Sequence, residues 1–399
     1  MVETFKPETS AQVVEAIAWA SGEEAPIEIR GTGTKRGFGR PMGDGNRTVG
    51  HVVDLSGLSG ITLYEPEELV LSAWASTPLA EIEAAVAEQG QMLAFEPPRF
   101  SRLYGEEGGT LGGMIACNLA GPRRIKAGAA RDHILGIEAV TGRGELVKSG
   151  GRVVKNVTGY DISKLLTGSF GTLAALTQIT IKVLPAPETV ETIIVPGLDP
   201  ADAVRAMSLA LNSSHEVSAA VHIPAELVEA VPGADGAAVT AIRVEGFVPS
   251  VGARSESLQK LLRDVGAVAT LDKAASAAFW NAVRDVEPFV GSKAPLWRLS
   301  VTPSEAPGIA ASMGGPAMLD WGGGLIWSAS PAQNTTAIRE TMASFGGGHA
   351  TLIRAADSDR RTVPVFQPQP APLAALSQRV KESFDPRHIL NPGRMYEGV

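Results

Sequence analysis

The sequence predicts an α+β protein in which a region of alternating strands and helices precedes a region with one antiparallel sheet. Over the first 184 residues, β-branched segments alternate with helical patterns and glycine-rich loops. From about residue 190, strands and helices alternate in the way typical of an antiparallel sheet with helices on one face. Pro185 and Pro187 lie between these regions and mark the clearest domain boundary.

Length and composition limit the class of protein. The chain has 399 residues, enough for two or three domains. We expect these domains at residues 1–187, 188–370 and 371–399. The net charge of −8, without long charged runs, argues against a nucleic-acid-binding protein. The single cysteine, Cys117, excludes an internal disulfide and a cysteine-based zinc or iron–sulfur site within the chain.

The sequence carries no targeting signal or metal motif. The N-terminus has charged residues and no apolar core, and no stretch of 18 apolar residues occurs, so we expect neither a signal peptide nor a transmembrane segment. The six histidines form no HxH or HExxH pair, so no metal site is predicted. Residues 43–46, GDGN, are expected to form a surface turn. A cytoplasmic location is the default expectation.

The first region is expected to begin with an amphipathic helix over residues 11–21, with Thr9-Ser10 as its cap. A second helix is expected over residues 77–90, with a proline in its first turn and a glycine just past its end. No regular structure is predicted for residues 106–121, because small residues there show almost no periodicity. The expected strands are residues 27–29, 51–55, 69–75, 134–141, 145–149 and 172–184.

The second region combines strands with amphipathic helices up to about residue 353. Its expected strands are residues 190–195, 217–223, 237–244 and 296–301. Its expected helices are residues 200–211, 255–265 and 274–286, and a last helix over residues 371–384 precedes the C-terminal tail.

Residues 30–37, RGTGTKRG, follow a short strand and resemble an anion-binding loop. Glycines and threonines leave backbone N–H groups free to point at phosphate oxygens, and Lys35 and Arg36 add positive charge. The spacing is not that of the dinucleotide-binding GxGxxG motif, because Arg36 stands where the third glycine belongs. A plain glycine-rich turn is the alternative interpretation.

Residues 110–122, TLGGMIACNLAGP, are rich in small side chains. Gly112, Gly113 and Ala116 would leave a flat surface on which a large planar ligand can lie. The alternative is a close-packed crossing of the core, in which the lone polar Asn118 would need a hydrogen-bond partner. Cys117 is interpreted as a small buried apolar residue and not as a nucleophile, since no base stands near it in sequence.

Three strings in fixed order, RGTGTKRG, TLGGMIACNLAGPRRIKAGAARDHILGIEAV and GGRVVKNVTGYDISKLLTGSFGTLAALTQITIKVLP, precede a tail with LNPGRMY. Further matching strings are LWRLSVTPSEAP, DWGGGLIW and GGHATL. Together they resemble flavoproteins of the vanillyl-alcohol-oxidase type, and within that group the FAD-binding subunits of bacterial glycolate oxidases. The resemblance covers most of the chain.

The resemblance implies a two-subdomain FAD-binding domain of the PCMH type, an α+β cap domain with an antiparallel sheet, and a C-terminal segment returning to the FAD domain. It implies that the pyrophosphate of FAD is held by Arg30, Gly31, Thr32, Gly33, Thr34 and Lys35. The residues implied to line the flavin and ribityl chain are Gly109, Thr110, Gly112, Gly113, Ala116 and Asn118. Further cofactor contacts are implied for Arg123, Gly128, Asp132, Gly171, Thr172 and Ile179.

Departures from the resembled group refine these expectations. Relatives that attach FAD covalently use a histidine in the first loop, whereas this chain has Thr32, Thr34 and Lys35, so non-covalent FAD is expected. The catalytic hydroxyacid dehydrogenases carry an HxGDGNxH string that is missing here, and Phe170 replaces their acidic residue in GSEGTLG. This chain would therefore hold FAD without itself oxidising the substrate.

The expected function is that of the FAD-binding subunit of a complex oxidising glycolate, a small 2-hydroxy acid, to glyoxylate. Its expected partners are a catalytic FAD subunit and an iron–sulfur subunit that carries the electrons onward, with a location at the inner face of the membrane through these partners. The alternatives are a free-standing FAD-dependent 2-hydroxyacid dehydrogenase and a non-catalytic assembly subunit.

Two residues are candidates for catalysis on this chain. Arg298 would clamp a carboxylate and His349 would accept a proton. The alternative is structural, with Arg298 paired to Asp320 or Asp285 and His349 in a glycine-rich turn.

Overall fold

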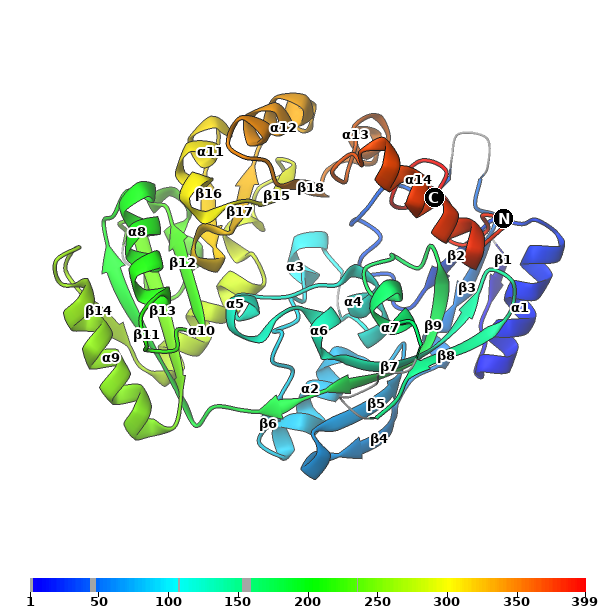
Figure 1. Ribbon diagram of the computed structural model, residues 1–399, viewed down its shortest axis with the longest axis horizontal. Helices are drawn as coiled ribbons and strands as arrows, with labels where there is room; N and C mark the ends of the chain where they lie inside the picture. The colour runs from blue at the N-terminus through cyan, green and yellow to red at the C-terminus, as the bar shows by residue number, and fades with distance from the viewer. Residues whose placement is uncertain (1–2, 44–47, 107, 153–158, 235) are drawn as a thin grey trace.

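The computed structural model describes residues 3–43, 48–106, 108–152, 159–234 and 236–399. Figure 1 shows two lobes, with both chain termini in the lobe that holds β1, β2 and β3. The expected turn at residues 43–46 lies, apart from its first residue, outside the described residues. None of the helices within the described ranges is both long and apolar enough to cross a membrane.

A small parallel sheet begins the chain. Its strand order is β1 (Glu3–Phe5), β3 (His51–Asp54) and β2 (Ile27–Arg30). Helix α1 (Ser10–Gly22) is close to the predicted helix, and the Thr9 side chain caps it by accepting a hydrogen bond from the N–H of Gln12 at 3.2 Å. Apolar side chains of α1 and of these strands form one buried cluster, which positions the end of β2, where the predicted anion-binding loop begins.

A five-stranded antiparallel sheet follows, with the order β4-β5-β9-β7-β8. Its strands are β4 (Ile61–Glu65), β5 (Val70–Trp74), β7 (Ile134–Thr141), β8 (Leu146–Gly150) and β9 (Ala174–Lys182). The sequence predicts four of these strands, and β4 is the addition. The other elements of this lobe are α2 (Leu79–Glu88), β6 (Gln91–Met92), α3 (Ser101–Tyr104), α4 (Leu111–Cys117), α5 (Arg124–Ala127), α6 (Ala130–His133), α7 (Ile162–Leu166) and β10 (Leu184–Pro185).

The prediction of no regular structure for residues 106–121 is wrong over α4. The Thr110 hydroxyl accepts a hydrogen bond from the N–H of Gly113 at 3.2 Å and so caps the helix. Gly112 donates its N–H to the carbonyl of Ala75 at 2.7 Å, which holds the first turn against the end of β5. These contacts outweigh the poor helix propensity of two adjacent glycines.

The second lobe is built on one eight-stranded antiparallel sheet with the order β14-β11-β13-β12-β16-β17-β15-β18. Its strands are β11 (Thr189–Pro196), β12 (Ala219–Ile223), β13 (Val239–Gly246), β14 (Ala269–Leu271), β15 (Leu296–Ser300), β16 (Ala317–Asp320), β17 (Leu325–Ala329) and β18 (His349–Arg354). The prediction of an antiparallel sheet with helices is thereby confirmed.

The two faces of this sheet have different neighbours. Helices α8 (Pro200–Leu211), α9 (Val248–Leu262), α11 (Ala306–Ser312) and α12 (Thr335–Ser344) pack with one face in a separate apolar cluster. Side chains of the other face, with helix α10 (Lys273–Arg284), join the apolar cluster of the first lobe. Helix α9 begins seven residues earlier than predicted, because Pro249 occupies its first turn, where the missing N–H costs nothing.

The C-terminal segment returns to the first lobe. After α13 (Asp357–Thr362), helix α14 (Ala371–Phe384) leads into a tail that pairs with β2. Ile27 donates its N–H to the carbonyl of Ile389 at 2.8 Å, and Asn391 donates its N–H to the carbonyl of Ile27 at 3.0 Å. The division into domains ending at residues 187 and 370 stays a prediction.

Candidate functional site

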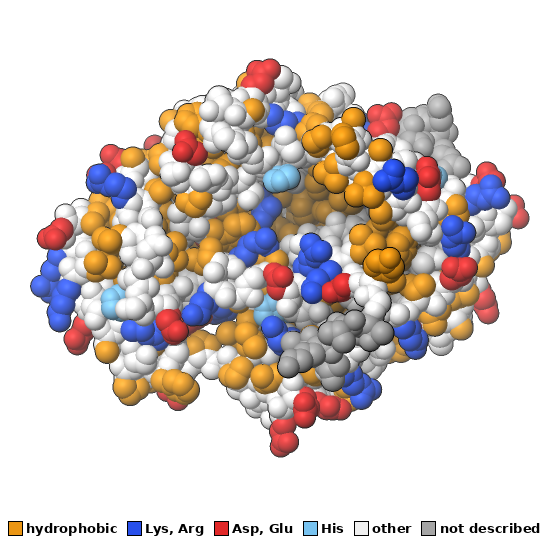
Figure 2. All heavy atoms as spheres, in the orientation of Figure 1, with side chains coloured by type: hydrophobic (Ala, Val, Ile, Leu, Met, Phe, Trp, Pro, Cys, Tyr) orange, Lys and Arg blue, Asp and Glu red, His pale blue; other side chains and the backbone are white. Residues whose placement is uncertain are grey.

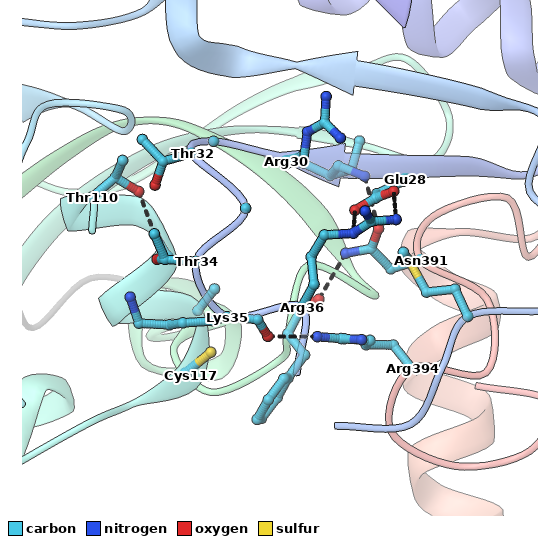
Figure 3. Close-up of a pocket in the computed structure, with 17 residues that line it drawn as sticks. Glu28, Arg30, Thr32, Thr34, Lys35, Arg36, Thr110, Cys117, Asn391 and Arg394 are labelled. Carbon is cyan, nitrogen blue, oxygen red and sulfur yellow. Dashed lines mark hydrogen bonds and ion pairs between the residues drawn. The ribbon is translucent and has the colours of Figure 1, made fainter. Parts of the chain in front are cut away.

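A pocket lies where the end of β2, the start of α4 and the C-terminal tail meet (Figure 3). Its wall consists of the loop after β2, one side of α4, Phe170 and two tail residues. The lining residues are Glu28, Ile29, Arg30, Gly31, Thr32, Gly33, Thr34, Lys35, Arg36, Met42, Thr110, Gly113, Ala116, Cys117, Phe170, Asn391 and Arg394. Nine predicted cofactor-binding residues thus come together: Arg30 to Lys35, Thr110, Gly113 and Ala116.

The loop after β2 is held from behind by buried arginines of the C-terminal segment. Arg394 donates hydrogen bonds to the carbonyl of Lys35 at 2.8 Å, to that of Arg40 at 2.9 Å and to that of Phe38. Arg360 donates to the carbonyl of Gly39 at 2.5 Å. Because these carbonyls point toward the tail, the loop keeps its shape without a regular element of its own.

Lys35 is a buried cation of the pocket. Its side chain points toward the part of the pocket where Thr34 and Thr110 lie, and away from Arg394 (Figure 3). The residue is 8% exposed, and its ammonium makes no hydrogen bond or ion pair with any residue within the described ranges. Burial lowers the pKa of Lys35. An ammonium left without a partner in such a place is costly, so the pocket favours a negatively charged ligand.

Gly31 and Gly113 leave room in the pocket because glycine has no side chain. A Cβ atom on Gly31 would lie 3.2 Å from Oγ1 of Thr110, and one on Gly113 would lie 3.3 Å from the same atom. Gly33 has a φ of +80°, a backbone conformation that glycine adopts without strain. At Gly31 and Gly113, any larger side chain would compete with the ligand for the pocket itself.

A second, more apolar compartment continues from the first. It shares Gly31, Thr110, Gly113 and Ala116 with the charged compartment and extends toward β5 and β9. Leu55, Ala75, Ser76, Gly112, Gly171, Ala174 and Leu176 complete its wall. A charged compartment joined to an apolar one suits a ligand that combines an anionic group with a flat ring system.

Cys117 lies in the wall beside Lys35. Burial raises the pKa of its thiol to about 11, and the positive charge of Lys35 opposes this only in part. The thiol is therefore protonated at neutral pH, which makes Cys117 a poor nucleophile.

Several predicted cofactor-binding residues lie outside the charged compartment, and contacts within the protein account for their side chains. The Oδ1 atom of Asn118 accepts a hydrogen bond from the N–H of Arg131 at 3.1 Å. Asp132 accepts one from the N–H of Ala129 at 2.8 Å, and a Cβ atom on Gly128 would lie 2.7 Å from the Asp132 carboxylate. Their roles toward a cofactor stay predictions.

Arg123 is engaged at the contact between the lobes, where its guanidinium lies 2.6 Å from Glu245 and 3.3 Å from Glu96. Thr172 donates its hydroxyl to the carbonyl of Ser169 at 2.8 Å, and Ile179 is a fully buried residue of β9. The remaining residues border the compartments. A Cβ atom on Gly109 would lie 3.4 Å from the Lys35 ammonium, while Gly112 and Gly171 line the apolar compartment.

The two catalytic candidates lie on the second lobe, away from this pocket. Arg298 pairs with Thr351 across β15 and β18, and Ser300 pairs with His349, so Arg298 and His349 share one face of the sheet. His349 is exposed at the start of β18. Figure 2 shows that the molecule is hollowed between the β15–β18 strands and helices α3 and α5, with basic side chains gathered there.

The alternative of an ion pair for Arg298 is not realised within the described residues. Asp285 pairs with Arg284 at 2.7 Å, and Asp320 lies beyond ion-pair distance of Arg298. Asp320 accepts a hydrogen bond from the N–H of Trp321 at 2.7 Å. Burial raises the pKa of Asp320 to about 7, although the Trp321 N–H opposes the shift. Within the described ranges, no group of three or more His, Cys, Asp or Glu side chains is placed to hold a metal ion.

Sequence reasoning assigned no role to two tail residues that border the pocket. Asn391 accepts a hydrogen bond from the N–H of Ile29 at 2.7 Å and donates one to the carbonyl of Phe170 at 2.8 Å. It thus ties together two segments of the pocket wall, while Arg394 holds the loop. The only available signal was the polar residues of the LNPGR string between apolar neighbours.

The fold and the pocket define a flavoprotein of the FAD-linked oxidoreductase class. A family model described as an FAD binding domain matches residues 3–150. A structure of p-cresol methylhydroxylase has the same fold, with a TM-score of 0.73 at 16% identity, over 98% of this chain and 88% of that chain.

The glycolate oxidase subunit GlcE of Escherichia coli K12 is 37% identical over 394 residues, or 97% of both chains. The glycolate oxidase subunit GlcD of Bacillus subtilis is 30% identical over 188 residues, which is 47% of this chain and 38% of that protein. The chain belongs to the family of the glycolate oxidase subunit GlcE, and its cofactor is FAD.

Proposed function

We propose that this chain is the FAD-carrying subunit of a multi-subunit complex that oxidises glycolate to glyoxylate. The likeness to GlcE over 97% of the chain supports this proposal. A second relative, GlcD, is named as another glycolate oxidase subunit, which supports a complex of several subunits. A catalytic FAD subunit and an iron–sulfur subunit are the proposed partners. When bound, FAD supplies a group that accepts a hydride from the α-carbon of a 2-hydroxy acid.

The observation that carries the cofactor site is the buried Lys35, whose ammonium has no partner among the described residues, in a pocket opened by Gly31 and Gly113. We assign the charged compartment to the pyrophosphate, because Lys35 and the glycine-rich loop after β2 would neutralise its charge. The apolar compartment would take an adjoining ring system. Asn391 and Arg394 would act as positioning residues that hold the loop around the cofactor.

The mode of attachment follows from the side chains of the loop. The loop contains no histidine that could form a covalent bond to the flavin; its side chains include those of Thr32, Thr34 and Lys35. FAD is therefore held without a covalent bond. Acid precipitation of the purified protein should release all flavin into the supernatant. Flavin that stays with the washed pellet contradicts this assignment.

The function is tested with the chain alone and with its co-expressed partner subunits. Flavin content and glycolate-dependent reduction of a dye are measured for each preparation. We expect FAD in the isolated chain, turnover only in the complex, and no turnover when the chain is left out. A chain without FAD would favour the non-catalytic assembly subunit.

The free-standing 2-hydroxyacid dehydrogenase is the second candidate. Arg298 favours it, because this side chain has no ion-pair partner in the part of the chain that the structure describes. On such an enzyme, Arg298 would clamp the substrate carboxylate and His349 would accept the hydroxyl proton. Steady reduction of the dye by the isolated chain with glycolate would establish this candidate in place of the first.

A further inference from the structure

Two arginines from different lobes lie against the same aromatic ring. The guanidinium carbon of Arg298, on β15, lies 5.0 Å from the centroid of Trp321, and that of Arg124, on α5, lies 4.9 Å from it. The two cations are therefore no more than about 10 Å apart, within the reach of one small ligand. The first lobe supplies Arg124, and the second supplies Arg298 and Trp321.

Neither guanidinium has a counterion within the described ranges. Among the described residues, no hydrogen-bond or ion-pair partner is found for the side chain of Arg124 or of Arg298, although both are partly buried. Burial and, after it, repulsion from Arg124 lower the pKa of Arg298 to about 10, and the charge of Asp320 opposes this only in part. Burial also lowers the pKa of Arg124, with a partial correction from Asp132.

Other stacked arginines in this protein show what a purely structural role looks like. Arg243 lies 4.8 Å from the centroid of Trp280, but it also forms an ion pair with Glu96 at 2.7 Å. Arg339 lies 5.8 Å from Trp297 and donates to the carbonyls of Pro364 and Phe366. Stacking in those cases accompanies hydrogen bonds or ion pairs from the same guanidinium, whereas no such partner is found for Arg124 or Arg298 within the described ranges.

The ring that both arginines approach is firmly held. Trp321 donates its indole N–H to the carbonyl of Gly121 at 3.1 Å and its backbone N–H to Asp320 at 2.7 Å. Its φ is +55°, which is a strained conformation for so large a residue. Strain maintained by surrounding contacts is typical of sites where a side chain is positioned for binding.

We propose that Arg124 and Arg298 together bind the carboxylate of a small 2-hydroxy or 2-oxo acid against Trp321. This inference rests on the proposed function for the identity of the acid. Each guanidinium presents five N–H donors, more than one carboxylate group can satisfy, so a ligand with a second oxygen next to the carboxylate fits the pair. Because each lobe contributes one arginine, the site is complete only while the lobes stay docked.

Oxalate is a suitable probe, because it carries adjacent oxygens and cannot be oxidised through an α C–H bond. The purified FAD-loaded chain is titrated with oxalate while tryptophan fluorescence and the melting temperature are followed. We expect saturable binding that raises the melting temperature. Arg124→Gln and Arg298→Gln should each weaken binding about tenfold or more, since each removes a charge-assisted contact.

Controls separate binding from folding and from the proposed function. Arg379→Gln, on the exposed face of α14, should leave oxalate binding unchanged. Where a glutamine variant fails to fold, lysine at the same position keeps the charge and should restore part of the affinity. Wild-type chain that binds no oxalate, or variants that bind it as tightly as wild type, would overturn the inference. Flavin content and turnover of the complex are measured independently, so failure of the proposed function would appear there.

Discussion

The adjacent glycines at the start of α4 serve different purposes. A Cβ atom on Gly112 would lie 2.8 Å from the carbonyl oxygen of Ala75, so glycine is required there for α4 to approach β5. The nearest atoms to a Cβ on Gly113 are side-chain atoms of Thr110 and Lys35, at 3.3 Å and 3.9 Å, and this residue lines the pocket. Gly112 therefore matters for packing, and Gly113 for the space left to the ligand.

Gly113→Leu should abolish FAD binding while most of the fold survives. The leucine side chain would occupy the volume that the cofactor needs. Flavin content after purification and the circular dichroism spectrum measure the two effects. Gly252→Leu, on the open side of α9, is the matched control and should retain flavin. Full flavin occupancy in Gly113→Leu would place the cofactor elsewhere.

Asp320→Asn should change how stability depends on pH. The folded protein holds the pKa of Asp320 at about 7, above the unfolded value near 3.9, so folding retains a proton that the unfolded chain loses. The free energy of unfolding therefore falls as pH rises from about 4 to 7, by on the order of 4 kcal/mol from this group. The asparagine side chain does not titrate, so the free energy of unfolding of the variant does not fall in this way. The variant should therefore become more stable relative to wild type as pH rises.

Urea unfolding at pH 5 and pH 8 tests this expectation. The stability difference between Asp320→Asn and wild type should be larger at pH 8. Asp202→Asn, on the exposed face of α8, should show no such change with pH. Equal differences at both pH values would mean that Asp320 titrates normally in the folded protein.

At the scale of elements, the sequence predicts what local patterns determine. Helix α1 follows from its amphipathic pattern and the Thr9 cap, and β7 and β8 follow from alternation around a glycine turn. Helix α4 escapes prediction because its start depends on Ala75, a partner 37 residues away in sequence. Strand β4, with its mixed and half-exposed pattern, shows little alternation by itself.

The candidate site divides in the same way. The loop after β2 is predictable, since glycines and threonines after a strand indicate an anion-binding turn. The roles of Asn391 and Arg394 are not, because the loop groups that they bond, on Ile29 and Lys35, lie more than 350 residues earlier in the chain. The difference between Arg123 and Arg124 is equally hidden, since one of the two carboxylates that neutralise Arg123, that of Glu245, comes from the second lobe.

Lys381→Met should destabilise the return of α14 to the first lobe. The ammonium of Lys381 lies 2.8 Å from Asp385, and both side chains are fully buried. Lys381 also donates to the carbonyls of Thr172 and Leu390, so its loss leaves an unpaired buried carboxylate and two unmet acceptors. We expect a loss of about 3–5 kcal/mol in the free energy of unfolding.

Urea denaturation provides the measurement for this element. Arg379→Met, on the exposed side of the same helix, is the control and should cost little. The double variant Lys381→Met, Asp385→Asn should recover part of the loss, because it removes the unpaired charge. A single variant as stable as the control would show that the pair contributes nothing.

Across the whole molecule, a buried network of four charges joins the two lobes. Glu96 and Arg123 belong to the first lobe, and Arg243 and Glu245 lie on β13. Burial alone would raise the pKa of Glu96, but Arg243 and Arg123 outweigh it and hold the pKa at about 2. The stabilisation from Glu96 is therefore present above pH 4.5 and is lost as pH falls toward 2.

Glu96→Gln should loosen the contact between the lobes. It leaves Arg243 and Arg123 with one shared carboxylate, at a cost of about 3 kcal/mol or more. Limited proteolysis should then cut the chain between β10 and β11 faster than in wild type, and oxalate affinity should fall because its two arginines sit on different lobes. Glu83→Gln, which breaks the more exposed pair with Arg99, is the control. Unchanged cleavage would show that apolar contacts alone hold the lobes.

The pairing of the C-terminal tail with β2 has a consequence for biosynthesis. The loop after β2 leaves the ribosome early, but the groups that hold its carbonyls, on Arg360 and Arg394, emerge more than 300 residues later. Asn391, which secures Ile29 to Phe170, also arrives late. A nascent chain therefore has no finished cofactor pocket, and we expect flavin loading to wait until the segment with Arg360, Asn391 and Arg394 has folded back.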